Sequence, residues 1–271
     1  QRPTVTVLPA KTAARCCVAR GNGLSEAVAG ERAVFSIAAR DAYGNVRDVG
    51  GDEFRILLRQ VGDGRPGEVW AAADGEATGA YTPQRAGRGS VEVTLGGEHI
   101  GGSPFSTRVR SAPATGATST AGGVGLHAAR AGERAGFELR TYDAYGNATG
   151  EAASPEVRVR RGGAVVEGEV SGGDEGVYSA SFVVTEAGDH VIDVLVAGAP
   201  VSGSPFRLLV SPAEPHAPHC RVVRPAPPTL VAGLSAVLTF ESRDAYNNLR
   251  PLGGDSFETF TTFEPAPEAA A

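Results

Sequence analysis

The sequence predicts an all-β protein made of tandem antiparallel β-sandwich domains, and three observations carry that prediction. Short motifs recur every 101 or 102 residues, a period that fits a whole small domain rather than a solenoid unit. Apolar and polar residues alternate ahead of each copy of the main motif, as in a strand with one buried face. Clusters of Gly, Pro, Asn and Asp interrupt these runs about every 8–12 residues, the spacing of a sandwich.

The repeat markers divide the chain into three units. Asp-Ala-Tyr-Gly-Asn occurs twice and returns once as Asp-Ala-Tyr-Asn-Asn, Gly-Ser-Pro-Phe occurs twice, and two series of Ala-Gly pairs keep the same period. The Asp-Ala-Tyr motifs begin at residues 41, 143 and 244, and the Gly-Ser-Pro-Phe motifs begin at 102 and 203. The Ala-Gly pairs begin at 29, 131 and 232 in one series and at 86 and 187 in the other. We therefore divide the chain into repeat one (1–111), repeat two (112–212) and a partial repeat three (213–271). Short joints rich in Pro, Ser or Thr are expected at 112–121 and 212–218.

Within each repeat the alternation places strands at equivalent positions. Before the Asp-Ala-Tyr motif, the inward-facing pairs are Phe35 and Ile37, Phe137 and Leu139, and Leu238 and Phe240. A later strand alternates in the same way at Val91, Val93 and Leu95, and again at Ile192, Val194 and Val196. Period two predicts that these residues face the core of each sandwich.

The Asp-Ala-Tyr-Gly-Asn motif predicts a tight turn. Asp accepts local backbone hydrogen bonds at turns, and Gly and Asn tolerate a positive φ. We expect the tyrosine to plug the end of its sandwich with its hydroxyl in water. Calcium binding is the alternative, but Ca²⁺ takes six or more oxygen ligands and the motif has few carboxylates. The turn residues are Asp41, Tyr43, Gly44, Asn45, Asp143, Tyr145, Gly146, Asn147, Asp244, Tyr246 and Asn248.

In order and spacing, these motifs resemble the filamin repeat. The series in repeat one is Ala29–Glu31, Asp41–Asn45, Gly79–Tyr81, Ala86-Gly87, Gly97–Ile100 and Gly102–Phe105, and repeat two matches it again. The resemblance implies an immunoglobulin-like antiparallel sandwich of seven strands. It also implies a rod that docks partner proteins, whose peptides add a strand beside the third strand in a groove formed with the fourth.

The resemblance places this groove on particular residues. The third strand is expected at Glu53–Arg59 in repeat one and at Glu156–Arg161 in repeat two, with the fourth strand of repeat one at about Glu68–Ala73. The candidate groove residues are Arg55, Leu57, Arg59, Trp70, Arg158 and Arg160. The arginines have two interpretations: charges that block unwanted strand pairing, or contacts that select acidic or amphipathic peptides.

The third repeat departs from the pattern because it ends early. A candidate third strand at Phe257–Phe263 is followed by Glu-Pro-Ala-Pro and alanines, and its period-two alternation fails after Phe257. Half a sandwich leaves strand edges and apolar faces exposed. We expect that the repeat continues beyond Ala271 or that a partner covers it.

Residues for catalysis or metal binding are sparse, so we expect a non-enzymatic protein without cofactors. There is no Gly-x-Ser-x-Gly elbow, and Lys11, the only lysine, rules out a phosphate-binding loop because it follows alanine. His216, His219 and Cys220 form the one compact His/Cys cluster, short of the four ligands of a structural zinc site. The net charge of −6 argues against nucleic-acid partners, and no apolar run is long enough to cross a bilayer.

The function predicted from these features is a scaffolding rod that binds other proteins in a cytoskeletal assembly. Three cysteines form no disulfide framework, which favours a reducing cytoplasmic compartment. We expect Cys16 and Cys220 to lie at comparable positions of two repeats. The alternatives are a cell-surface adhesion ectodomain and an accessory module of a larger enzyme. If the protein is secreted, the Asn147-Ala148-Thr149 sequon could carry a glycan.

Overall fold

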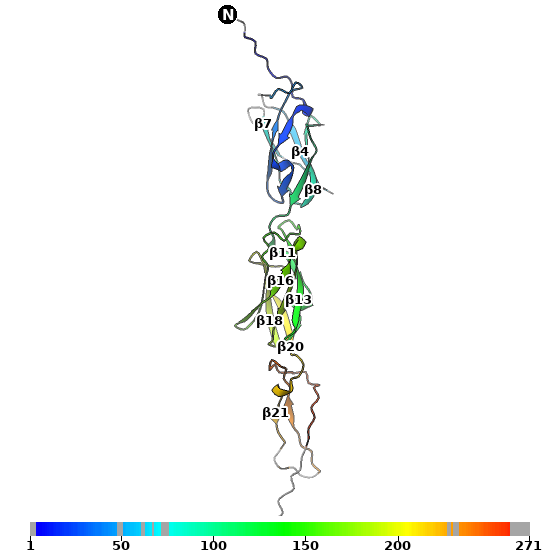
Figure 1. The fold of residues 1–271 in the computed structure, drawn as a ribbon, viewed down its shortest axis with the longest axis vertical. Coiled ribbons are helices and arrows are strands. Elements are labelled where there is room, and N and C mark those ends of the chain that lie inside the picture. Colours follow the sequence, from blue (N-terminus) through cyan, green and yellow to red (C-terminus); the bar gives the residue numbers. More distant parts are fainter. Residues whose placement is uncertain are drawn as a thin grey trace, which may run out of the picture.

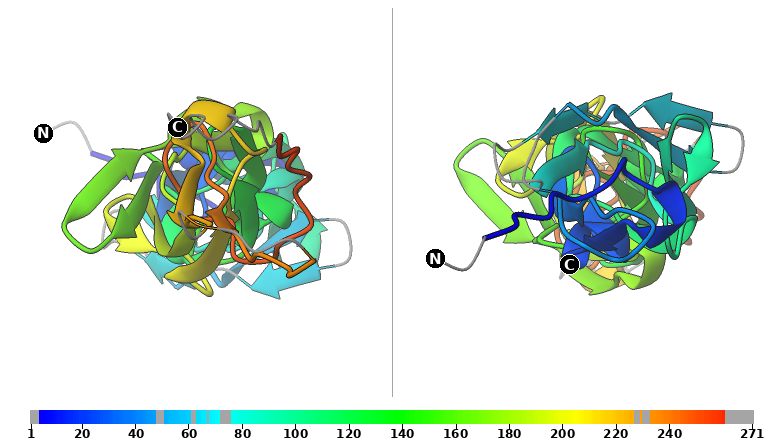
Figure 2. Two further views of the ribbon diagram at one scale, coloured as in Figure 1. Left: turned by 90° about the horizontal axis from the view of Figure 1, so that it is seen from below. Right: turned by 90° about the horizontal axis from the view of Figure 1, so that it is seen from above.

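The computed structural model describes residues 4–47, 51–60, 63–66, 68–71, 76–226, 229 and 233–260, with backbone alone at 63–66 and 68–71. Figure 1 shows the repeats end to end in an elongated rod. Each of the first two repeats is a sandwich of two sheets, which confirms the predicted fold class. In Figure 2, which looks along the rod, the repeats lie over one another.

In the described part of repeat one, ten strands form two sheets. One sheet has the order β1-β3-β7-β6; the other has the order β2-β10-β8-β4-β5, with β9 paired to β8. The strands are β1 (Val18–Arg20), β2 (Glu26–Val28), β3 (Ala33–Ala38), β4 (Phe54–Gln60), β5 (Asp63–Pro66), β6 (Glu68–Ala71), β7 (Glu76–Tyr81), β8 (Gly87–Leu95), β9 (Glu98–His99) and β10 (Phe105–Arg110), with short 3₁₀ turns η1 (Ala14–Cys16) and η2 (Asn22–Leu24).

Repeat two has the same topology, with sheets β11-β13-β17-β16 and β12-β20-β18-β14-β15 and with β19 paired to β18. In both repeats the first strand divides between the sheets, and its second half pairs in parallel with the last strand. The elements are β11 (Thr115–Gly122), η3 (Val124–Leu126), β12 (Ala128–Arg130), β13 (Arg134–Tyr142), β14 (Glu156–Arg161), β15 (Ala164–Glu167), β16 (Glu169–Gly172), η4 (Asp174–Gly176), β17 (Val177–Val183), β18 (Gly188–Val196), β19 (Ala199–Pro200) and β20 (Phe206–Ser211).

The first joint is shorter than the sequence suggested. Residues 112–121 are polar and small, yet β11 takes up Thr115–Gly122 and pairs with β13. The Ser/Thr-rich stretch is therefore the first strand of repeat two. A strand at the edge of a sheet needs only one buried face, so its low apolar content conceals it.

The alternating residues form two separate cores, one in each full repeat. Ile37, Val91 and Val93 are fully buried in the first, and Leu139, Ile192 and Val194 in the second. The Gly-Ser-Pro-Phe motif closes each core at the end of the long strand: Ser103 Oγ accepts the Val93 N–H at 2.9 Å, and Ser204 Oγ accepts the Val194 N–H at 3.0 Å.

Replacing Leu139 with alanine should test this core. The side chain is fully buried at the centre of repeat two, so we expect a loss of about 3 kcal/mol in the unfolding free energy of that repeat. Leu209→Ala is the control, because Leu209 lies on the adjacent sheet with 57% of its surface exposed and should cost less than about 0.5 kcal/mol. Urea denaturation of both variants gives the comparison; equal losses would contradict the assigned core.

Repeat three has the two-stranded sheet of β21 (Arg221–Arg224) and β22 (Thr239–Glu241), preceded by η5 (Ala217–His219). The predicted third strand at Phe257–Phe263 is wrong for Phe257–Phe260, where the backbone forms no strand; its other residues lie outside those described. In repeats one and two the third strand pairs with a long later strand, β8 or β18. Repeat three has no such partner among the described residues. Instead, the Phe257 ring stacks on Phe240 at 4.8 Å.

Candidate functional site

The Asp-Ala-Tyr-Gly-Asn turn is organised by a buried aspartate that accepts four hydrogen bonds. In repeat two, Asp143 Oδ1 accepts the backbone N–H groups of Tyr145 and Asn147, both at 2.9 Å. Its Oδ2 accepts the Asn147 side-chain amide at 2.8 Å and the Ala112 backbone N–H at 3.0 Å. Since all four donors are N–H groups, the carboxylate is fully engaged by the protein, which argues against the calcium alternative.

Ala112 lies in the joint between the repeats, so the aspartate also anchors the incoming chain. The arrangement occurs three times with the same separation of 31 residues: Ala10 to Asp41, Ala112 to Asp143 and Ala213 to Asp244. All three aspartates are inaccessible to solvent. The turn therefore fixes where each repeat begins.

These hydrogen bonds favour the ionised carboxylate and lower its pKa. The Asn45 side-chain amide lowers the pKa of Asp41 to about 2, helped by backbone N–H groups. At Asp143 and Asp244, burial opposes ionisation, but the asparagine amide and the backbone donors outweigh it and lower the pKa of both groups. The turns are therefore built around charged aspartates at neutral pH.

The stability of repeat one should fall as the pH drops from about 4 to 2. An unfolded aspartate titrates near pH ~3.9, whereas folded Asp41 titrates near pH 2. The unfolded chain therefore takes up the proton first, and the stabilisation present above about pH 4 is lost on the way to pH 2. Urea midpoints at pH 7, 4, 3 and 2 measure the slope for the native chain and for Asp41→Asn. The variant should show a shallower slope in this window; identical slopes would contradict the role of Asp41.

The same turn docks onto the neighbouring repeat. Asn147 Nδ2 donates to the Gln84 carbonyl at 2.8 Å, and Asn147 Oδ1 accepts the Ala86 N–H at 2.8 Å. At the next joint, Asn248 repeats both bonds, to the Thr185 carbonyl at 2.7 Å and from the Ala187 N–H at 2.8 Å. Each asparagine thus pairs with a backbone carbonyl and an N–H two residues apart at the base of the preceding repeat.

The tyrosines of the second and third turns each rest on a glycine of the preceding repeat. Gly30 has φ +80° and Gly132 has φ +79°, and a Cβ at either would overlap a tyrosine ring, that of Tyr145 or of Tyr246. The positive φ and the close approach both require glycine here. This explains why the Ala-Gly pairs keep the period of the Asp-Ala-Tyr motif: the two form opposite sides of one joint.

The predicted role of the tyrosine is therefore wrong in one respect. Tyr145 does not close its own sandwich but lies across the joint, with 45% of its surface exposed, and Tyr246 lies there with 46%. Tyr43, at the same position in repeat one, is 84% exposed. Sequence reasoning assigned the motif to a single domain; the shared period of the tyrosine and the glycine was the signal that could have shown the joint.

Asn147 is a poor glycan acceptor in this arrangement. Both hydrogens of its side-chain amide are donated, one to Gln84 and one to Asp143, and its oxygen accepts the Ala86 N–H. Attaching a sugar to Nδ2 would remove at least one of these bonds and open the joint. The asparagine of this sequon is therefore a residue that holds the joint between the repeats.

The third strands lie close to where the resemblance placed them, at β4 and β14. Arg55 and Arg59 are exposed and Leu57 is partly exposed, while Arg158 and Arg160 are exposed in repeat two. The fourth strand of repeat one is β6 (Glu68–Ala71); the side chain of Trp70 and residues 72–73 lie outside the described part.

The edge of each third strand is already paired, which the resemblance did not predict. In repeat two, β15 covers β14 from Arg158 to Arg161, and the Gly168 N–H donates to the Val157 carbonyl at 2.8 Å. In repeat one, β5 covers β4 from Leu57 to Gln60. An incoming strand would therefore meet β5 or β15 over these residues.

Three of the groove arginines, Arg59, Arg158 and Arg160, pair with carboxylates of their own repeat. Arg59 bonds to Glu92 at 2.5 Å, and Arg160 binds both carboxylate oxygens of Asp193. Arg158 bonds to Glu156 at 2.6 Å and approaches Glu167 at 3.5 Å. Exposed pairs of this kind contribute only about 0–1 kcal/mol each, so a partner carboxylate could compete for the same arginines.

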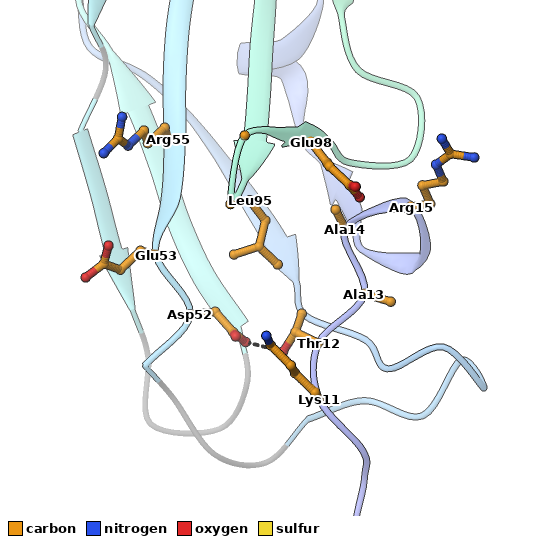
Figure 3. Close-up of a pocket in the computed structure, with 12 residues that line it drawn as sticks. Lys11, Thr12, Ala13, Ala14, Arg15, Asp52, Glu53, Arg55, Leu95 and Glu98 are labelled. Atoms are coloured by element: carbon orange, nitrogen blue, oxygen red, sulfur yellow. Dashed lines mark hydrogen bonds between the residues drawn. The ribbon is translucent and has the colours of Figure 1, made fainter.

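A cavity lies at the end of repeat one, where the chain enters it. Figure 3 shows Leu95 between the strand that carries Arg55 and β9, which carries Glu98, with the segment of Lys11 and Thr12 beneath. Thr12 Oγ1 donates to Asp52 at 2.6 Å and holds that segment against the sandwich. Arg55 thus lines this cavity at the end of repeat one where the chain enters.

No metal site or membrane helix is found in the part of the chain that the structure describes. Within those ranges, no three His, Cys, Asp or Glu side chains gather in a way that could hold a metal ion. The described ranges also contain no helix long and apolar enough to span a membrane. The rings of His216 and His219 pack edge to face with their centroids 4.9 Å apart. His219 Nδ1 lies 2.8 Å from the Asp244 carbonyl, so this cluster contacts and stabilises the third turn.

The three cysteines are free thiols, but their correspondence needs correction. Cys17, rather than Cys16, is the counterpart of Cys220: their sulfurs lie 3.9 and 3.6 Å from the carbonyls of Arg40 and Arg243. Burial raises the pKa of the Cys17 thiol, which keeps it protonated and unreactive at neutral pH.

Comparison with known proteins agrees with this geometry. Rat (Rattus norvegicus) Filamin-C is 29% identical over 228 residues, covering 78% of this chain and 8% of Filamin-C. The mouse (Mus musculus) E3 ubiquitin-protein ligase TRIM71 is 35% identical over 94 residues, covering 34% of this chain and 11% of the ligase. The chain thus spans a small fraction of these relatives.

A solved structure of the Escherichia coli adhesin FdeC superposes with a TM-score of 0.56 at 21% identity, covering 89% of this chain and 77% of that one. At this identity the likeness concerns the fold alone. The family model of the Filamin/ABP280 repeat matches residues 11–106 and 113–207, which together make up most of the sequence. The chain belongs to the filamin repeat family, whose repeats serve as structural and protein-interaction modules.

Proposed function

We propose that this chain is a non-catalytic scaffolding segment, a rod that holds partner proteins within a cytoskeletal assembly. The observation that carries the proposal is the pair of matching joints, in which Asn147 and Asn248 make the same two bonds to the preceding repeat. A joint used twice with the same geometry sets a constant orientation from repeat to repeat. A rod with constant joints can hold bound partners at fixed separations.

Partners bind by strand addition, and the described geometry favours the free edge of β15. Figure 2 shows the β14–β15 hairpin projecting from the side of the rod. All four residues of β15 are exposed, including Val165 at 53% and Val166 at 36%. A β-branched edge strand with unpaired backbone groups is a template for another strand.

The register of the hairpin shows which residues would pair with a partner. Val159 lies opposite Val166, and Arg160 lies opposite Val165. Because hydrogen-bonded and non-hydrogen-bonded pairs alternate along an antiparallel ladder, and Gly168 donates to Val157, the backbone groups of Val165 and Glu167 point away from β14. A partner strand would bond to these two residues.

A proline at position 165 tests strand addition. Val165→Pro removes an outward N–H but no bond of the hairpin, and edge strands tolerate proline. Val165→Thr is the control, since it keeps the N–H and the branched shape. We expect cross-linking mass spectrometry in intact cells to give links from β15 to intracellular filament proteins, reduced about fivefold or more by proline and unchanged by threonine.

Three results would contradict the proposal. Equal link yields for the proline and threonine variants would rule out strand addition at β15. Links to surface or extracellular proteins in place of filament proteins would reject the cytoskeletal placement and favour an adhesion ectodomain. A catalytic domain on the same polypeptide, linked to these repeats, would favour an accessory module of an enzyme.

A further inference from the structure

Residues 4–8 carry the pattern of a strand yet pair with nothing among the described residues. The segment Thr-Val-Thr-Val-Leu alternates, and its apolar side chains are open to solvent: Val5 is 80%, Val7 is 87% and Leu8 is 74% exposed. In Figure 1 this segment leads away from the end of repeat one. Exposed β-branched residues in period two are unusual for a loop and typical of a strand taken out of its sheet.

The turn geometry shared by the three repeats fixes the register of this segment. Ala10 donates to Asp41 as Ala112 does to Asp143 and Ala213 does to Asp244. Counting back from each alanine, Val5 corresponds to Thr107 and Leu208, and Val7 corresponds to Val109 and Val210. Those four residues are the inward-facing side chains of the last strands β10 and β20, and each is at most 2% exposed.

The turn of repeat one is a second, independent sign of a missing neighbour. Tyr43 is 84% exposed, whereas Tyr145 and Tyr246 are half covered by the preceding repeat. Asn45 makes the local bond to Asp41, at 2.9 Å, that its counterparts make. The docking face of the turn is thus already formed in repeat one.

We propose that Thr4–Leu8 is the last strand of another filamin-type repeat, and that the turn of Tyr43 and Asn45 docks on the base of that repeat. The two joints within the chain define this occupant. Its base offers a glycine with positive φ beneath Tyr43, and a carbonyl and an N–H two residues apart for Asn45. Val5 and Val7 enter its core, as Leu208 and Val210 enter that of repeat two. This inference stands whether or not the rod is cytoskeletal.

Two chimaeras of the whole chain test the two halves of this proposal separately. In the first, residues 113–206 are placed directly before Thr4, so that Thr4–Leu8 replaces the last strand of a copied repeat two. In the second, residues 113–212 are placed directly before Ala10, so that the copied repeat keeps its own last strand and only docking is tested. Both preserve the spacing of the native joints.

In the first chimaera, we expect amide hydrogen exchange at Val5 and Val7 to slow about a hundredfold or more relative to the parent chain. A further variant with Val5→Asp and Val7→Asp should leave the copied repeat unfolded. If the second chimaera folds while Val5 and Val7 exchange freely in the first, the strand assignment is overturned.

In the second chimaera, we expect the nitration rate of Tyr43 to fall to that of Tyr145, and the Asn45 side-chain amide to gain protection. A folded copied repeat with Tyr43 still as reactive as in the parent chain would overturn the docking. Asn45→Ala, made in the same chimaera, should restore part of the Tyr43 reactivity.

Discussion

Replacing Asp143 with asparagine is expected to destabilise repeat two by about 3 kcal/mol or more, although the two side chains have nearly the same shape. Asp143 is fully buried and accepts four N–H groups. An asparagine would turn an amide donor toward donors of the turn, leaving buried N–H groups unpaired. Hydrogen bonds to a charged acceptor contribute about 1.5–3 kcal/mol each, and an orphaned partner adds its desolvation cost.

Urea denaturation, followed by hydrogen exchange in each repeat, measures this effect. Asp174→Asn is the matched control, because Asp174 lies exposed in η4 of the same repeat and should change stability by less than about 0.5 kcal/mol. Repeat one should keep its own protection, since its core is separate. A cost for Asp143→Asn as small as that of the control would show that the carboxylate does not organise the turn.

Replacing Tyr145 with alanine should loosen the joint between repeats one and two while leaving both repeats folded. The ring lies against Gly30, but the turn itself depends on the Tyr145 backbone N–H, which alanine keeps. Loss of the ring contact should cost about 1–2 kcal/mol of docking free energy, roughly a tenfold shift toward the undocked state.

Residual dipolar couplings and X-ray scattering measure the joint directly. For the native chain, a single alignment tensor should fit both repeats; for Tyr145→Ala, the repeats should need separate tensors. Tyr43→Ala is the matched control, since Tyr43 occupies the same position in repeat one and is 84% exposed. If Tyr145→Ala keeps a single tensor, the asparagine bonds alone hold the joint.

Much of the fold could be predicted from the sequence because it depends on local patterns. The period-two alternation at Phe35 and Ile37 and at Val91 and Val93 gives the buried face of each strand correctly. The third strands, which the family resemblance placed, lie within a residue of the expected ranges at β4 and β14. The prediction failed at Phe257–Phe260, where the alternation breaks after Phe257 and no neighbouring strand that would pair with it is among the described residues.

The hairpins that cover the third strands were missed for another reason. In repeat two, Gly162 and Gly163 join β14 to β15, and a Gly-Gly pair between strands is a known hairpin signal. β15 is fully exposed on both faces, however, so it has no alternation to mark it. The resemblance therefore placed the free edge at the third strand, whereas β15 lies outside β14 from Arg158 to Arg161.

The sequence by itself determined the architecture of this protein. The strand faces and the turn chemistry of Asp, Gly and Asn depend on interactions within a few residues, and the period repeats these local patterns in each domain. Only the tertiary structure decided what the turns do, because Asn147 meets Gln84 and Tyr145 meets Gly30 across separations that no local pattern encodes. A joint forms between two surfaces, and its bonds appear only when both have folded and are brought together.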